Sequence, residues 1–142
     1  MPRYVEVDRK KLEDFLQTCG FQKRRQGSEM IYVRSNRFCD DVVTKVYTSF
    51  PYKDGTPARD RGQDAIRVTC AYESEIPFQG RDSFGIFKAT KILRTGSEEA
   101  ILDRLYHRMQ EAYLAGNSWL RKHWTEIQAD RKRADEAEKK HR

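Results

Sequence analysis

Apolar and polar residues follow two different periods along this chain, and the changes of period mark the predicted elements. After Asp8, apolar residues recur at i, i+3, i+4 and i+7, which is the spacing of one helical face. Asp8 suits the N-cap of this helix, and Gly20 suits the position just after its end. The sequence therefore predicts an N-terminal helix whose buried stripe is Leu12, Phe15, Leu16 and Cys19.

Several later segments have the alternation or the β-branched and aromatic composition of strands. A hairpin is predicted with its turn near Gly27, and residues 4–7 are expected to form a short edge strand. The remaining predicted strands cover residues 41–50, 64–73 and 84–94. Alternation is clearest in the second of these, where one side carries Ile66, Val68, Cys70 and Tyr72.

The strand over 84–94 has two candidate faces that decide where its charged residues point. Its core side is expected to hold Phe87, Ala89 and Leu93. Its opposite side is then expected to hold Lys88, Thr90, Ile92 and Arg94.

A long C-terminal helix is predicted to begin after Ser97, a suitable N-cap. Gly116 and Asn117 are typical of a helix end, so a second helix is expected to follow from Ser118. This pattern predicts an α+β domain over residues 1–116 and a charged helical extension over 117–142. The domain is expected to be an antiparallel sheet of four to five strands, with the N-terminal helix and the long helix packed on one face.

Composition and short motifs limit the expected classes of partner, compartment and cofactor. The chain has 142 residues and a formal net charge of +6, which favours nucleic acid or another anionic partner. Its three cysteines form no CxxC pair, which favours a reducing compartment over a disulfide scaffold or a zinc site. No signal peptide or membrane-spanning run is recognisable, so a cytoplasmic location without membrane contact is expected. The glycines form neither GxGxxG nor a P-loop, and we expect no cofactor and no metal site.

Cationic and aromatic residues remain once the core faces are assigned. On an uncovered sheet face they suit single-stranded DNA or RNA, because cations neutralise phosphates and an aromatic ring stacks on bases. A solvated polar face with no ligand is the open alternative. The candidate binding residues are Lys45, Tyr47, Lys53, Arg59, Arg61, Arg67, Lys88 and Arg94.

Two other function classes stay open. The C-terminal helix carries an apolar face of Leu120, Trp124 and Ile127, which suits a protein partner or a homo-oligomer. The stretch from Arg59 to Asp64 places two arginines beside carboxylates, which suits a metal-dependent nuclease or another phosphoryl-transfer enzyme.

Residues 9–33 combine a predicted helix and hairpin with a set of residues typical of one known family: Gly20, Phe21, Arg25, Gln26, Gly27 and Ser28. In these residues the segment resembles the HicA-type toxin family. This resemblance implies a double-stranded-RNA-binding-like fold that opens with a helix and a hairpin, in a family that cleaves mRNA. Glu29 stands where the family has its catalytic histidine, so the resemblance does not extend to ribonuclease activity. The pattern of the whole chain is similar to small uncharacterised proteins of bacteria and phages, which implies no activity.

Overall fold

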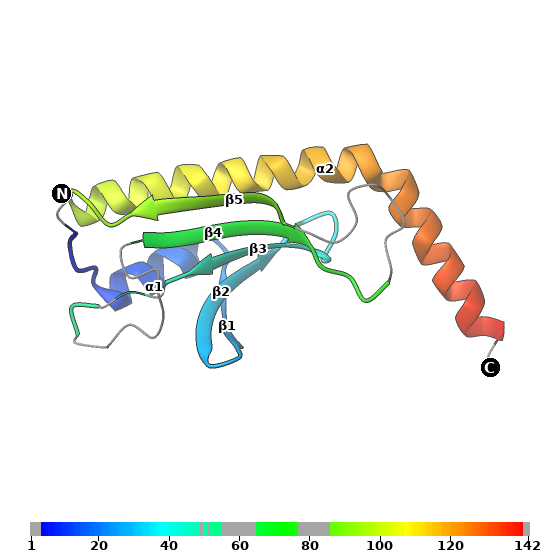
Figure 1. Cartoon of the computed structure of the whole chain (residues 1–142), viewed down its shortest axis with the longest axis horizontal. Coiled ribbons are helices and arrows are strands. Elements are labelled where there is room, and N and C mark those ends of the chain that lie inside the picture. The colour runs from blue at the N-terminus through cyan, green and yellow to red at the C-terminus, as the bar shows by residue number, and fades with distance from the viewer. Residues whose placement is uncertain (1–3, 49, 51, 55–64, 77–85, 141–142) are drawn as a thin grey trace.

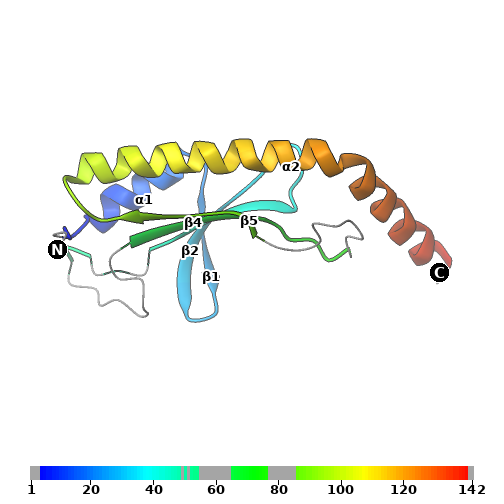
Figure 2. The ribbon, with the colours of Figure 1, turned by 45° about the horizontal axis from the view of Figure 1, so that its top comes forward.

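Five antiparallel strands form one sheet, and two helices cover the same face of it (Figures 1 and 2). The computed structural model describes residues 4–48, 50, 52–54, 65–76 and 86–140. The elements in chain order are α1 (Arg9–Thr18), β1 (Gln22–Gln26), β2 (Glu29–Ser35), β3 (Val42–Tyr47), β4 (Ala65–Tyr72), β5 (Ile86–Leu93) and α2 (Glu98–Lys140). Each strand pairs with the next one in sequence. The predicted α+β fold class is confirmed.

Local sequence signals account for α1 and the hairpin. Asp8 caps α1 by accepting a hydrogen bond from the Lys11 backbone N–H at 3.0 Å. Gly20 follows the helix with φ +90°, and Gly27 takes φ +63° in the turn between β1 and β2. Both conformations favour glycine because it lacks a Cβ atom.

The prediction of an edge strand at residues 4–7 is wrong. Among the described residues, this segment forms two isolated bridges in place of a strand, between Tyr4 and Thr95 and between Val7 and Tyr52. Val7 is buried, and its carbonyl accepts a hydrogen bond from the Lys53 backbone N–H at 3.2 Å. The N-terminal segment therefore closes one end of the core without adding a strand to the sheet.

The two faces of β4 match the prediction, whereas those of β5 are reversed. Ile92 pairs with Ile66 and is only 3% exposed, while Leu93 is 40% exposed. The pairing register shifts between Cys70 and Ala71, which leaves Phe87 as an extra residue in β5. Phe87 still packs against the helix-side core, so the strand after it continues in the opposite phase.

The helix end predicted at Gly116 is also wrong, because α2 runs without interruption through this residue. A Cβ atom on Gly116 would lie 3.2 Å from Cγ1 of Val42 and 3.5 Å from Sγ of Cys70. Glycine therefore lets α2 approach the sheet closely at this point.

Residues beyond Gly116 belong to the same hydrophobic core as the first half of α2. Trp119, Leu120 and Ile127 are buried in one cluster with Ile101 and Leu105. The ring of Trp119 lies 5.0 Å from that of Tyr72 and stacks on Phe87 at 5.2 Å. The boundary predicted between residues 116 and 117 thus coincides with neither a helix end nor an edge of the core. The C-terminal part of α2, orange to red in Figure 1, extends past the strands of the sheet.

Neither of the two described helices combines the length and the apolar character needed to cross a membrane.

Candidate nucleic-acid interface

The face of the sheet opposite the helices carries a row of residues that crosses all five strands. Directly paired residues in antiparallel strands point to the same face. Arg24 pairs with Ile31, Ile31 with Tyr47, Tyr47 with Arg67, and Arg67 with Lys91. We call these five residues the cross-sheet row.

An arginine and a tyrosine in contact form the centre of the row. The guanidinium carbon of Arg67 lies 4.9 Å from the centroid of the Tyr47 ring, within the range of a cation–π interaction. The hydroxyl oxygen of Tyr47 accepts a hydrogen bond from Nε2 of Gln26 at 3.3 Å. The side chains of Tyr47 and Arg67 are both half-buried, so the tyrosine ring is held in a defined orientation.

Apolar contacts fix the same tyrosine from beneath. Ile31, Val33 and Val43 form a second buried cluster on this face, and Tyr47 packs against it. Ile31 is fully buried although α1 and α2 both lie on the other side of the sheet. The centre of the row is therefore an aromatic platform on a packed base.

The ends of the row are cationic. Arg24 on β1 and Lys91 on β5 are exposed, and neither forms an ion pair with another residue in the described part of the chain. Neighbouring strands lie about 4.8 Å apart, so four intervals separate these residues by about 19 Å. Arg24, Arg67 and Lys91 thus place three cations across the width of the sheet.

Lys45 lies on the same face but is already neutralised. Its Nζ is 2.7 Å from Oε1 of Glu73 and donates a hydrogen bond to Oε1 of Gln26 at 3.0 Å. The prediction placed Lys45 beside Tyr47 correctly in the sheet, but its charge is paired within the protein.

Three of the predicted binding residues lie away from this face. Lys88 points to the helix side, where its Nζ is 3.7 Å from Oε2 of Glu111 on α2. Arg94 is buried, donates a hydrogen bond to the Val5 carbonyl and lies over the Phe50 ring at 5.0 Å. The reversed phase of β5 explains why Lys88 is on the helix side.

Lys53 is the third of these residues. It is exposed and forms a salt bridge with Glu98 in the first turn of α2. The remaining predicted residues, Arg59 and Arg61, lie outside the described residues, as does Asp64 of the enzymatic alternative.

The sequence prediction missed the two ends of the row. Lys91 is adjacent to the buried Ile92, so alternation counted from Ile92 places Lys91 on the face opposite the helices. Arg24 belongs to a strand in which every residue is exposed, so its composition alone does not distinguish one face from the other. Only the register between β1 and β2 aligns Arg24 with Ile31 and Tyr47.

The predicted partner residues on α2 differ in accessibility. Ile127 is fully buried and Leu120 is 5% exposed, so both belong mainly to the protein's own core. Trp124 is half-buried, with the guanidinium of Arg131 5.8 Å from its ring centroid. Ile127 is therefore unavailable to a partner, whereas Trp124 retains accessible surface.

Acidic, histidine and cysteine side chains do not gather in groups of three or more that would suit a metal ion, as far as the structure describes the chain. The pKa of the Cys70 thiol is raised by burial, which disfavours the nucleophilic thiolate form.

In comparisons with known proteins, no family model, no curated protein and no solved structure matches this chain.

Proposed function

We propose that this protein binds single-stranded nucleic acid across the sheet face opposite its helices. The observation that carries the proposal is the cross-sheet row, in which three cations flank or contact one fixed aromatic ring. Proteins that bind single strands without sequence preference combine these two components. The cations neutralise phosphates, and the ring provides a surface on which a base stacks.

Each component of the row has its own part in this binding mode. Arg24 and Lys91 contact phosphates at the two edges of the sheet, about 19 Å apart by the spacing of strands. Tyr47 stacks with one base between them. Arg67 holds the ring from one side. The net charge of +6 accelerates the encounter with a polyanion.

This mode favours single strands over duplexes. A base reaches the Tyr47 ring only when it is unstacked from its neighbours, and paired bases resist this. A row with one aromatic platform also reads no base edges, so weak sequence preference is expected.

Salt dependence tests the phosphate contacts. We expect the logarithm of the binding constant for a labelled oligothymidylate or oligouridylate to fall linearly with the logarithm of salt concentration. Arg24→Ala and Lys91→Ala are each expected to reduce this slope by about 0.7, the value for one phosphate contact on a single strand. Fluorescence anisotropy over a salt series provides the measurement.

Lys10→Ala is the matched control, because Lys10 is an exposed lysine on α1, on the other side of the sheet. Its slope is expected to equal that of the unmodified protein. If all three variants keep the slope of the unmodified protein, the proposed contacts are contradicted. An equal reduction in all three would show that only the overall charge matters.

A further inference from the structure

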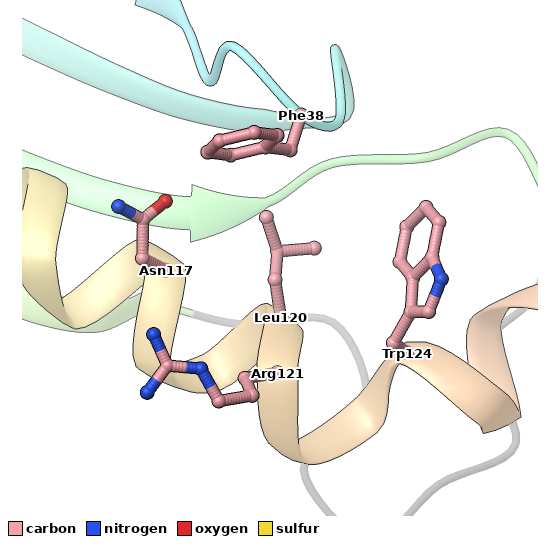
Figure 3. A pocket seen from close by; sticks show the side chains of 5 residues that line it. All are labelled: Phe38, Asn117, Leu120, Arg121 and Trp124. Carbon is pink, nitrogen blue, oxygen red and sulfur yellow. The ribbon is translucent and has the colours of Figure 1, made fainter.

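A groove of about 510 Å³ lies on the helix side of the molecule, away from the cross-sheet row. It runs between α2 and the connection from β2 to β3 (Figure 3). Its lining residues are Phe38, Asn117, Leu120, Arg121 and Trp124. The proposed binding of nucleic acid does not use this groove.

One wall of the groove is an exposed aromatic ring on a firmly held loop. Phe38 is 67% exposed. Its backbone N–H donates to Oδ1 of the buried Asn36 at 2.8 Å, and Nδ2 of Asn36 donates to Oδ1 of Asn117 on α2 at 2.9 Å. The fold therefore presents this ring to solvent from a fixed backbone. Exposed aromatic residues of this kind are enriched at protein interfaces.

The opposite wall is tied to the same connection. Arg131 lies 5.8 Å from the Trp124 ring centroid and donates to Oδ2 of Asp41 at 3.3 Å and to Sγ of Cys39 at 3.2 Å. Leu120 forms the floor and points toward Phe38 (Figure 3). Both walls and the floor are thus positioned before any ligand arrives.

The two ends of the groove differ in polarity. Trp124 lies at one end, while Asn117 and Arg121 lie toward the other (Figure 3). Arg121 is the only charged side chain among the described lining residues, and it is exposed without an ion pair to another described residue. Asn117 uses its amide oxygen to accept from Asn36, which leaves its NH₂ group as a donor. This end is complementary to a carboxylate.

We propose that the groove binds a short peptide segment of a partner protein, in which one leucine or phenylalanine side chain is next to an acidic residue. The apolar side chain inserts between Phe38 and Trp124 over Leu120, and the carboxylate pairs with Arg121. A volume of about 510 Å³ suits one or two side chains better than a broad protein surface. The exposed end of α2 over 131–140 has no large apolar residue to serve as this anchor.

Fluorescence polarisation with labelled pentapeptides tests this assignment. The probes carry a central leucine or phenylalanine flanked by glutamates, and matched probes carry glutamines or lysines instead. Phe38→Ala is expected to weaken binding of the glutamate probes about tenfold or more, because it removes a wall of the groove. Arg121→Glu is expected to weaken the glutamate probes similarly and to strengthen the lysine probes.

Lys132→Glu serves as a charge-reversal control on an exposed position of α2 outside the groove, and its affinities are expected to be unchanged. The proposal is overturned if no glutamate probe binds with a Kd below about 1 mM. It is also overturned if both groove variants bind as the unmodified protein does. Two further results would assign the groove to another occupant: a dimer in sedimentation that Phe38→Ala dissociates, or loss of oligonucleotide binding in Phe38→Ala.

Discussion

Reversing the charges at both ends of the cross-sheet row, with Arg24→Glu and Lys91→Glu in one chain, is expected to weaken single-strand binding about 100-fold. Each reversal replaces an attraction to a phosphate by a repulsion, and about tenfold per position corresponds to about 1.4 kcal/mol. Both side chains are exposed, so the fold is expected to survive. Anisotropy titration of a labelled oligothymidylate at fixed low salt gives the comparison.

The control for this result carries Lys10→Glu and Lys132→Glu. Each reversal removes two charge units, so both double variants have a formal net charge of +2 instead of +6. The control positions are exposed and lie on α1 and α2, away from the row. If the control double variant loses as much affinity as the row variant, the net charge explains binding and the row does not.

Removing residues 117–142 is expected to unfold the protein. The shortened chain loses the buried side chains of Trp119, Leu120 and Ile127 and uncovers the rings of Tyr72 and Phe87. Burial of each large apolar side chain contributes about 1.5–3 kcal/mol, so three of them approach the whole stability of a typical domain, about 5–15 kcal/mol. Circular dichroism is expected to show no cooperative thermal transition.

A chain that lacks only residues 135–142 provides the comparison for this truncation. It keeps every buried residue of α2 as well as Arg131 and Arg133, which pair with Asp41 and Asp130. Its Tm is expected to stay close to that of the full chain. A cooperative transition near the same temperature after removal of 117–142 would show that α2 beyond Gly116 is dispensable for folding.

Elements whose signals are local could be predicted from the sequence. The cap at Asp8, the glycines at positions 20 and 27, and the alternation from Ile66 to Tyr72 each specify structure within a few residues. Gly116 could not be interpreted in this way. A glycine that ends a helix and a glycine that admits a close neighbour look alike in sequence. Here the neighbours are Val42 and Cys70, which lie far from Gly116 in the sequence.

The residues of the candidate site also divide into those with a local sequence signal and those placed by pairing between strands. The regular alternation of β3 and β4 predicts that Tyr47 and Arg67 lie on the face opposite the helices, as they do. The phase of β5 depends on an irregularity in its pairing with β4, so simple alternation wrongly predicts Lys88 on the face opposite the helices and leaves out Lys91. Alignment of Arg24 with the row depends on register across two further strand pairs. Non-local pairing of this kind leaves no pattern in the sequence of a single strand.

Amide chemical-shift mapping by NMR, with an unlabelled oligothymidylate added to the full chain, tests the central claim most directly. We predict that the largest changes in chemical shift fall on the backbone amides of Arg24, Tyr47, Arg67 and Lys91 and their strand neighbours. The amide chemical shifts of Phe38 and Trp124 are expected to be unchanged. Changes concentrated on α2, or no change at saturating oligonucleotide, would contradict the assignment of this sheet face as a nucleic-acid interface.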